Sequence, residues 1–131
     1  MKLLLNRRFL NLYEKGFYIK NDYYNGINAA YLLNVRGKIA DDQNDAIADY
    51  TIAKRIRVKV VNICKNLYSD DCFEERSDRY WIVATLEEAY FALGFKEKYT
   101  DIRKVSESLS QENWERKTTE EQISKLKILI E

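Results

Sequence analysis

The sequence predicts an all-α protein in which antiparallel helix hairpins stack into a short α-solenoid of about six helices. Proline is absent and glycine occurs only four times in 131 residues, which leaves few turn-forming residues for an all-β fold. Two helix-length runs of aromatic and small residues, 23–37 and 80–94, each end in glycine, and a second helical run follows each of them. An apolar content of 46% suits one domain with its own core.

The leading segment, residues 1–21, carries apolar residues at helical spacing until Gly16, where we expect its helix to stop. The first hairpin is predicted over residues 22–68. Its first helix has Asp22 as the capping residue and Gly37 as the closing residue.

The second helix of this hairpin is predicted to be extended, from Asp41 to Tyr68. Acidic residues gather toward its start and basic residues toward its end, an order that complements the helix macrodipole. Gly26 lies inside the first helix, where glycine costs about 1 kcal/mol relative to alanine. Close approach of another helix backbone explains that glycine, and room for a ligand is the alternative.

The second hairpin is predicted over residues 77–109, after a polar loop at 69–76. Asp78 is placed to cap its first helix, which ends at Gly94, and its second helix continues to Leu109.

A terminal helix is predicted over residues 117–131. Thr118 and Glu121 have the spacing of a capping box that would start it. Together these segments are expected to form a single domain over residues 1–131.

The similarity between the first helices of the two hairpins indicates a helical repeat with irregular spacing. Gly37 and Gly94 lie 57 residues apart, whereas a tetratricopeptide repeat (TPR) is about 34 residues long. An extended second helix and an inserted loop explain the difference. We therefore predict a TPR-like fold of about two hairpins and a terminal helix.

Composition argues against several classes of function. The chain has 22 Lys and Arg and 21 Asp and Glu, so its net charge of +1 provides no bulk attraction to nucleic acid or membranes. Histidine is absent, which removes the commonest general base and an imidazole metal ligand. The cluster of Asp41, Asp42 and Asp45 lacks the glycine and distal glutamate of a calcium loop. We expect no enzyme activity, no metal and no cofactor.

The N-terminus and the cysteines indicate the cytoplasm. The apolar run over residues 1–5 is interrupted by an asparagine and two arginines at 6–8, unlike a signal peptide. No stretch approaches the roughly 20 apolar residues of a membrane span. Cys64 and Cys72 are expected to be reduced thiols, with a disulfide left open as the alternative.

Several strings of residues resemble a known family. They are Leu12 to Phe17, Tyr24 to Ala30, Tyr80 to Ala89 with Gly94 behind, and Trp114 followed by Thr118, Gln122 and Leu126. Over roughly residues 10–130, the chain resembles the TPR-like sensor module of bacterial conflict and signalling proteins. That module is similar to the TRAF-binding region of the apoptosis-signal-regulating MAP kinase kinase kinases. The resemblance implies a non-enzymatic domain that senses a nucleotide-derived signal in bacteria and takes part in protein–protein regulation in the kinases.

In a TPR hairpin, one face of the first helix lines a concave groove, and alignment on the closing glycines places two rows of side chains there. The predicted ligand-binding set is Tyr24, Asn28, Tyr31, Asn34, Trp81, Thr85 and Glu88. Its rings could stack on a base, at about 1–3 kcal/mol per base, while its polar groups bind a sugar. The alternative is that the rings only pack the hairpins together.

Arg36 and Arg55 are the candidates for phosphate contact, because arginine can bind phosphate through two hydrogen bonds. The alternative for the basic residues of the long helix is a solvated face.

Two functions follow from these patterns. The first is a sensor that binds a small, nucleotide-like signal in the concave groove and controls an effector protein on another chain or in a missing domain. The alternative is a protein–protein interaction scaffold that binds a peptide or helix in the same groove. A homo-oligomer is also predicted, because the apolar Leu3, Leu4 and Leu5 make a poor end cap for a solenoid. Nucleic-acid and membrane partners are not expected.

Overall fold

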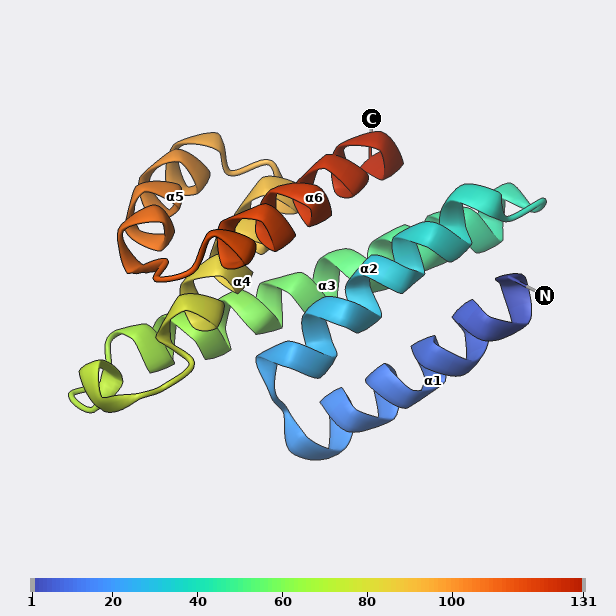
Figure 1. The fold of residues 1–131 in the computed structure, drawn as a ribbon. Helices are drawn as coiled ribbons and strands as arrows, with labels where there is room; N and C mark the ends of the chain where they lie inside the picture. Colours follow the sequence, from blue (N-terminus) through green and yellow to red (C-terminus); the bar gives the residue numbers. More distant parts are fainter. Residues whose placement is uncertain (1, 131) are drawn as a thin grey trace. The chain divides into compact units, whose positions relative to one another are not determined.

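The computed structural model describes the backbone of residues 2–130 and the side chains of residues 7–130. Within that part of the chain, the structure has six α-helices, one short 3-10 helix and no strand, so the prediction of an all-α fold is confirmed (Figure 1). The elements are α1 (Lys2–Lys20), α2 (Tyr23–Ile39), α3 (Gln43–Tyr68), η1 (Phe73–Glu75), α4 (Arg79–Leu93), α5 (Lys96–Leu109) and α6 (Asn113–Ile130).

Internal packing divides the chain into two compact units, Met1–Val60 and Val61–Glu131, with the boundary inside α3. The first unit contains α1, α2 and the first part of α3. The second contains the rest of α3 together with η1, α4, α5 and α6. The self-association predicted through Leu3, Leu4 and Leu5 concerns side chains outside the described ones.

The core of the first unit forms where three helices meet at a glycine. A Cβ atom at Gly26 would lie 2.5 Å from Cγ2 of Val60 and 2.8 Å from the ring of Phe17. Both neighbours are fully buried, as are Leu10 and Leu33. The nearest neighbours of Gly26 are therefore side chains of α1 and α3, not the helix backbone that was predicted, and any larger residue would push α1 and α3 away from α2.

The predicted helix ends at Gly16 and Gly37 are wrong. α1 continues through Gly16, which lies against the side chain of Asn25, and stops after Lys20, where Asn21 adopts the left-handed conformation with φ of 55°. α2 likewise continues through Gly37, because this glycine makes room for the ring of Tyr50 rather than terminating the helix. Both glycines serve helix packing.

The predicted cap of α2 is confirmed. An oxygen of the Asp22 carboxylate accepts a hydrogen bond from the backbone N–H of Asn25 at 2.8 Å, which is the N-cap geometry. α3 begins at Gln43, two residues later than predicted, and ends at Tyr68 as expected.

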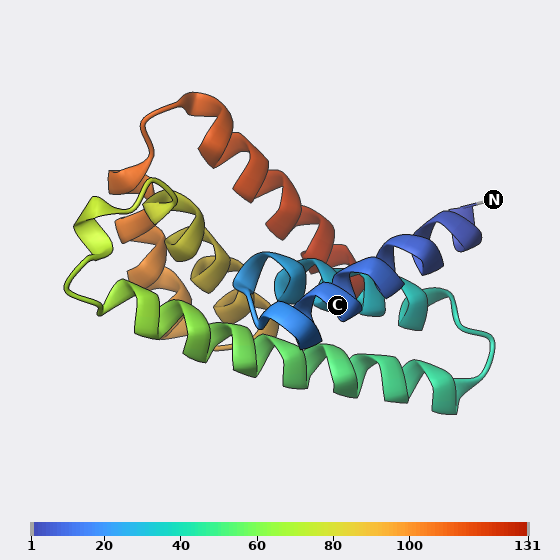
Figure 2. The same cartoon turned by 90° about the horizontal axis from the view of Figure 1, so that it is seen from below.

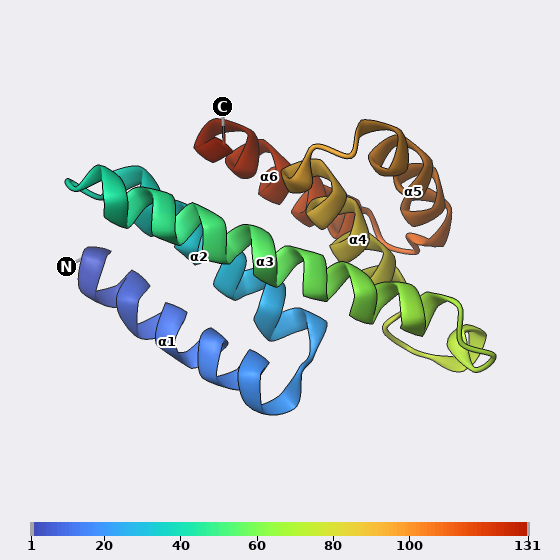
Figure 3. The ribbon, with the colours of Figure 1, turned by 180° about the vertical axis from the view of Figure 1, so that it is seen from behind.

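In the second unit, the end of α4 and the whole of α5 match the prediction. Gly94 has φ of 79°, and its N–H donates to carbonyl groups of the last turn of α4. The N–H of Phe95 reaches back to the carbonyl of Tyr90 at 3.0 Å. This left-handed glycine cap reverses the chain into α5, which runs from Lys96 to Leu109 as predicted. Figures 1, 2 and 3 all show α4 and α6 beginning close together and running alongside each other.

The predicted start of the last helix is wrong. α6 begins at Asn113, and Thr118 lies inside it, where its hydroxyl donates to the carbonyl of Trp114. The capping side chain is Glu115, whose carboxylate accepts from the N–H groups of Gln111 and Glu112 at 2.9 and 3.0 Å. The carboxylate of Glu115, in the first turn, therefore caps a helix that starts at Asn113, before the capping box predicted at Thr118.

Two further expectations for this unit need correction. Asp78 occupies the N-cap position of α4, but its carboxylate pairs with Arg76 and caps no N–H. The predicted loop at 69–76 contains η1, whose buried Phe73 ring packs edge-to-face on Tyr68 at 5.0 Å. An aromatic contact thus gives this polar segment a local structure.

Candidate functional site

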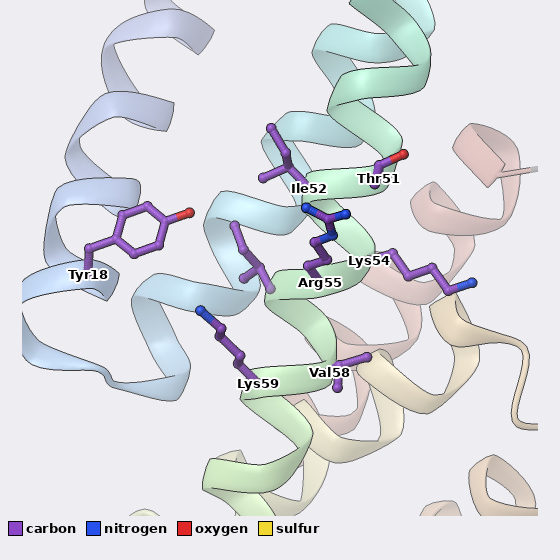
Figure 4. Close-up of a pocket in the computed structure, with 8 residues that line it drawn as sticks. Tyr18, Thr51, Ile52, Lys54, Arg55, Val58 and Lys59 are labelled. Carbon is purple, nitrogen blue, oxygen red and sulfur yellow. The ribbon is translucent and has the colours of Figure 1, made fainter.

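The largest described hollow of the first unit lies between α1 and α3. It has a volume of about 660 Å³ and is lined by Tyr18, Thr51, Ile52, Lys54, Arg55, Ile56, Val58 and Lys59. We call it the α1–α3 groove. Figure 4 shows Tyr18 projecting from α1 toward α3, with Arg55 and Lys59 extending into the same space. The groove is shallow and open to solvent along α3.

The periodicity of α3 explains why this face is free to form a groove. Ala53, Ile56 and Val60 are spaced at i, i+3 and i+7 and are buried, so they turn one stripe of the helix into the core. Lys54, Arg55, Val58 and Lys59 lie off this stripe and are exposed, whereas Arg57 is buried.

The groove combines apolar surface with positive charge. Tyr18 is 59% exposed and Val58 is 45% exposed, so the groove presents apolar surface to solvent. Lys54, Arg55 and Lys59 supply three cations, and none of the eight described lining residues is acidic. The sequence of α3 contains no Asp or Glu from residue 50 to its end. The surface therefore favours a ligand that is both acidic and partly apolar.

A second hollow of about 450 Å³ in this unit has a different character. Its lining includes Arg7, Arg36, Asp41, Asp45 and Asp49. Arg36 donates two hydrogen bonds to Asp49, at 2.9 and 2.8 Å. These bonds, and the negative charge of Asp49, raise the pKa of Arg36 against the opposing effect of burial. The predicted bidentate phosphate contact by the Nε and Nη2 groups of Arg36 would compete with Asp49, whereas Arg55 lies in the α1–α3 groove.

The predicted ligand residues of α2 do not share one environment. Tyr24 is 60% exposed, and its ring packs edge-to-face on Tyr13 at 6.0 Å. The amide of Asn28 donates to the carbonyl of Tyr24 at 2.8 Å, so it bonds within its own helix. Asn34 is buried, and its amide oxygen accepts a hydrogen bond from Nη1 of Arg57. Tyr31 is half-buried.

The predicted ligand residues of α4 belong to the second unit. Trp81 is half-buried, with its ring edge-to-face on Tyr80 at 4.9 Å and 5.7 Å from the ring of Trp114. The hydroxyl of Thr85 is buried and donates to the carbonyl of Trp81 at 2.6 Å. Glu88 is half-buried. The local bonds of Thr85 and Asn28 leave fewer of their polar groups for a sugar than the prediction assumed.

Comparison with known families decides the identity of the fold. A family model described as the MAP3K TRAFs-binding domain matches residues 5–129. The chain belongs to this family. The match confirms the predicted similarity to the TRAF-binding region of the MAP kinase kinase kinases, and it names a family of protein-binding domains rather than of enzymes. Neither the search of curated proteins nor the search of solved structures gave a match. The resemblance to a bacterial sensor stays a prediction.

Sequence reasoning missed a buried polar cluster in this MAP3K TRAFs-binding domain. Glu87 of α4 is fully buried, and its carboxylate accepts hydrogen bonds from Arg116 of α6 and from the hydroxyl of Ser106 of α5. The sequence signal was a glutamate on the apolar face of α4, next to Leu86, where a charged residue needs a partner.

Sequence reasoning also missed the pairing of the two tryptophans. Residues 81–88 and 114–121 share the pattern Trp-x-x-x-Thr-x-Glu-Glu, 33 residues apart. In both copies the threonine hydroxyl donates to the tryptophan carbonyl, at 2.6 Å in α4 and 2.7 Å in α6. The spacing is close to a TPR period of about 34 residues, so this repeat was a better guide to the helix order than the two closing glycines.

The described part of the domain contains no cluster of three Cys, Asp or Glu side chains able to hold a metal ion. Among the same residues, no helix combines the length and the apolar content that a bilayer span requires.

Proposed function

We propose that this domain is a protein-interaction module, and that its α1–α3 groove binds an acidic, partly apolar segment of the partner protein. The observation that carries the proposal is the groove itself, whose eight described lining residues include three cations and the exposed apolar side chains of Tyr18 and Val58, and no acidic residue. Family membership supports a protein partner, since the family is described as TRAFs-binding. A TRAF domain is therefore the first partner to test.

The chemistry of the groove favours a peptide over a small polar signal. Tyr18, Ile52 and Val58 offer apolar surface along two helices, and such surface contributes to affinity only when a partner covers it. Lys54, Arg55 and Lys59 then favour a segment with carboxylates, because complementary charge steers association and selects among partners. A short acidic helix or extended strand with one large apolar residue satisfies both conditions.

Nucleotide sensing and control of an effector remain predictions from the resemblance, and a cytoplasmic location remains a prediction from the sequence. The amide oxygen of Asn34 and two nitrogens of Arg36 already bond to Arg57 and Asp49, which leaves these residues fewer groups for a signal than predicted. The protein-interaction function uses neither residue.

The experiment is titration calorimetry of the purified chain with a panel of purified TRAF domains. We expect at least one to bind, and the double variant Arg55→Glu/Lys59→Glu to bind it about tenfold or more weakly. The matched control, Arg8→Glu/Lys38→Glu, changes the charge equally at two exposed positions outside the groove and should retain affinity. Absence of binding to every TRAF domain, or equal loss in both variants, would overturn the proposal.

A further inference from the structure

The outward side of α1 presents apolar side chains that no other described helix of the first unit covers. α1 packs on α2 at one edge of this unit (Figures 1 and 3). Leu10 and Phe17 turn inward and are buried. Leu12 and Ile19 are 59% and 79% exposed and, at about 100° per residue, lie on the opposite side of the helix. Phe9, which is 47% exposed, lies at the edge of the same surface.

Two cations lie on the same side of α1. Arg8 and Lys15 are seven residues apart, as are Leu12 and Ile19, so the four side chains form one stripe along the helix. Both cations are exposed, and within the described residues neither is paired with a carboxylate. We call Arg8, Phe9, Leu12, Lys15 and Ile19 the α1 outer face. None of these five residues lines the α1–α3 groove, so the two surfaces are distinct.

The acidic residues of the first unit lie away from the α1 outer face. Glu14, the one acidic residue of α1, is half-buried, and its negative charge acts on Arg36 of α2. Asp22 caps α2. The other four acidic residues of the unit are Asp41, Asp42, Asp45 and Asp49, around the start of α3. Three of these four line the second hollow together with Arg7, which is therefore not counted in the outer face.

The net charge of the whole chain hides the excess of cations in this unit. Residues 1–60 contain 11 Lys and Arg against 6 Asp and Glu, a net charge of +5, whereas the whole chain has +1. The expectation of no membrane partner rested on the value for the whole chain. A unit with a charge of +5 is attracted to an anionic surface even though the chain as a whole is nearly neutral.

Charge and shape together favour a lipid surface as the occupant of the α1 outer face. A second copy of this face would bring like charges together, since Arg8 and Lys15 would oppose each other. A protein partner usually anchors a side chain in a pocket, but neither described hollow of the unit contains Phe9, Leu12 or Ile19. A bilayer needs no matching pocket. It accepts exposed apolar side chains of a helix at the boundary between headgroups and acyl chains, and its anionic headgroups attract the cations.

We propose that α1 lies flat on an anionic membrane surface through its outer face. Leu12 and Ile19 enter the boundary between headgroups and acyl chains, with Phe9 beside them. The long stems of Arg8 and Lys15 let their charged ends reach the headgroups while the helix stays at this depth. The attachment is peripheral and reversible, because it uses one face of one helix while Leu10 and Phe17 stay in the core.

The experiment is flotation of the full chain with large vesicles of phosphatidylcholine alone, and with vesicles that also contain about one third phosphatidylserine. At low salt we expect the partition coefficient to be about tenfold or more higher on the anionic vesicles, because each cation near the surface adds to the attraction. At about 0.5 M salt it should fall toward the value for phosphatidylcholine alone, since salt screens exposed charges.

Two variants separate the apolar contribution from that of charge. Leu12→Ser/Ile19→Ser keeps every charge and should lower the partition coefficient on anionic vesicles about tenfold, because less apolar surface leaves water. Arg8→Glu/Lys15→Glu keeps the apolar side chains and should reduce binding to the level on phosphatidylcholine. Circular dichroism of each variant confirms that the helices are intact.

Each variant has a matched control elsewhere in the chain. Ile47→Ser/Ile128→Ser removes two apolar side chains that are 53% and 74% exposed on other helices. Lys104→Glu/Lys125→Glu reverses two exposed charges of the second unit. Both controls should stay within about threefold of the unmodified chain, because their side chains do not enter the bilayer and distant charges are screened.

Failure of the unmodified chain to bind anionic vesicles, or full binding by either α1 variant, would overturn the proposal. Equal losses in the variants and their controls would do the same. Binding to polyglutamate through Arg8 and Lys15 without vesicle binding would assign the face to an acidic protein instead. Self-association in sedimentation velocity that Leu12→Ser/Ile19→Ser abolishes, without vesicle binding, would assign it to a second copy. The proposed function is tested separately, because no α1 variant changes Arg55 or Lys59.

Discussion

Arg116 and Glu87 form a buried ion pair, with Nη1 of the arginine 2.8 Å from Oε1 of the glutamate. The glutamate side chain is fully buried and that of Arg116 is 14% exposed. Burial lowers the pKa of Arg116, but the hydrogen bonds and charge of Glu87 together raise it well above its ordinary value. Ser106 joins the pair from α5, so α4, α5 and α6 share one polar cluster.

Removal of one partner from this pair should be costly. We expect Glu87→Gln to lower the free energy of unfolding by about 3 kcal/mol, because the charge of Arg116 would lose its buried counter-ion. Urea denaturation measures the change. Glu107→Gln is the matched control, because its ion pair with Arg103 is exposed and should contribute at most about 1 kcal/mol. Similar losses in both variants would contradict a special role for the buried pair.

Gly26→Ala tests the close approach of the three helices in the first unit. In an open helix this change would stabilise by about 1 kcal/mol. Here the new Cβ would meet Val60 and Phe17 at 2.5 and 2.8 Å, so we expect a net loss of about 1–3 kcal/mol from overpacking. Thermal and urea unfolding show directly whether the variant is less or more stable than the unmodified chain. A more stable variant would show that α1 and α3 lie farther from Gly26 than described.

The two cysteines should differ in reactivity. Burial, and secondarily the negative charge of Asp78, raises the pKa of the Cys64 thiol to about 12. Cys72 is exposed. With a thiol reagent at pH 8 we expect Cys72 to react in the folded protein and Cys64 only after unfolding. Rapid labelling of Cys64 in the native chain would contradict its burial.

The raised pKa of Cys64 also predicts that the folded protein loses stability at alkaline pH. The pKa of Cys64 is higher in the folded state than its unperturbed value of 9.0, so the folded state disfavours the thiolate. The contribution of the neutral Cys64 thiol to the free energy of unfolding is complete below about pH 9. It declines as the pH rises toward 12, at up to about 1.4 kcal/mol per pH unit. Cys64→Ala should unfold more easily at neutral pH but show a shallower alkaline slope. Cys72→Ala, the control, should keep the slope of the unmodified chain.

The two aspartates that precede helices should contribute unequally. Asp22 accepts a hydrogen bond from the N–H of Asn25, so Asp22→Ala should cost about 1 kcal/mol. Asp78 makes no capping hydrogen bond to the start of α4, and its pair with Arg76 is partly exposed, so Asp78→Ala should cost less. Equal effects in urea unfolding would mean that the structural difference between the two caps has no energetic consequence.

Local patterns predicted those elements whose signals act within one turn of the chain. Gly94 can adopt the left-handed conformation, and a polar residue at Asp22 can cap a helix, whatever surrounds them. Gly16 and Gly37 have the same local signal but a different role, because distant side chains, Asn25 and Tyr50, occupy the space beside them. A single sequence does not distinguish a glycine that ends a helix from one that admits a neighbour.

The candidate site was less predictable for the same reason. Arg55 was selected for its charge, and it lies in the α1–α3 groove, but Tyr18 and Val58 carried no signal that set them apart from core residues. Their exposure follows from which face of α3 turns inward. The sequence indicated Trp114 only as part of a family pattern. Its contact with Trp81 could not be predicted locally, because the two residues are 33 positions apart.

The division of the chain inside α3 has a practical consequence for dissecting the protein. α3 is unbroken over 26 residues, so a cut at residue 60 would expose unsatisfied N–H and carbonyl groups on both fragments. The second piece would also begin with only the last two turns of α3, a stub too short to persist alone in water. A fragment that ends in the segment around residues 69–72, or one that begins just before Gln43, retains all of α3 and is the kind that should survive excision.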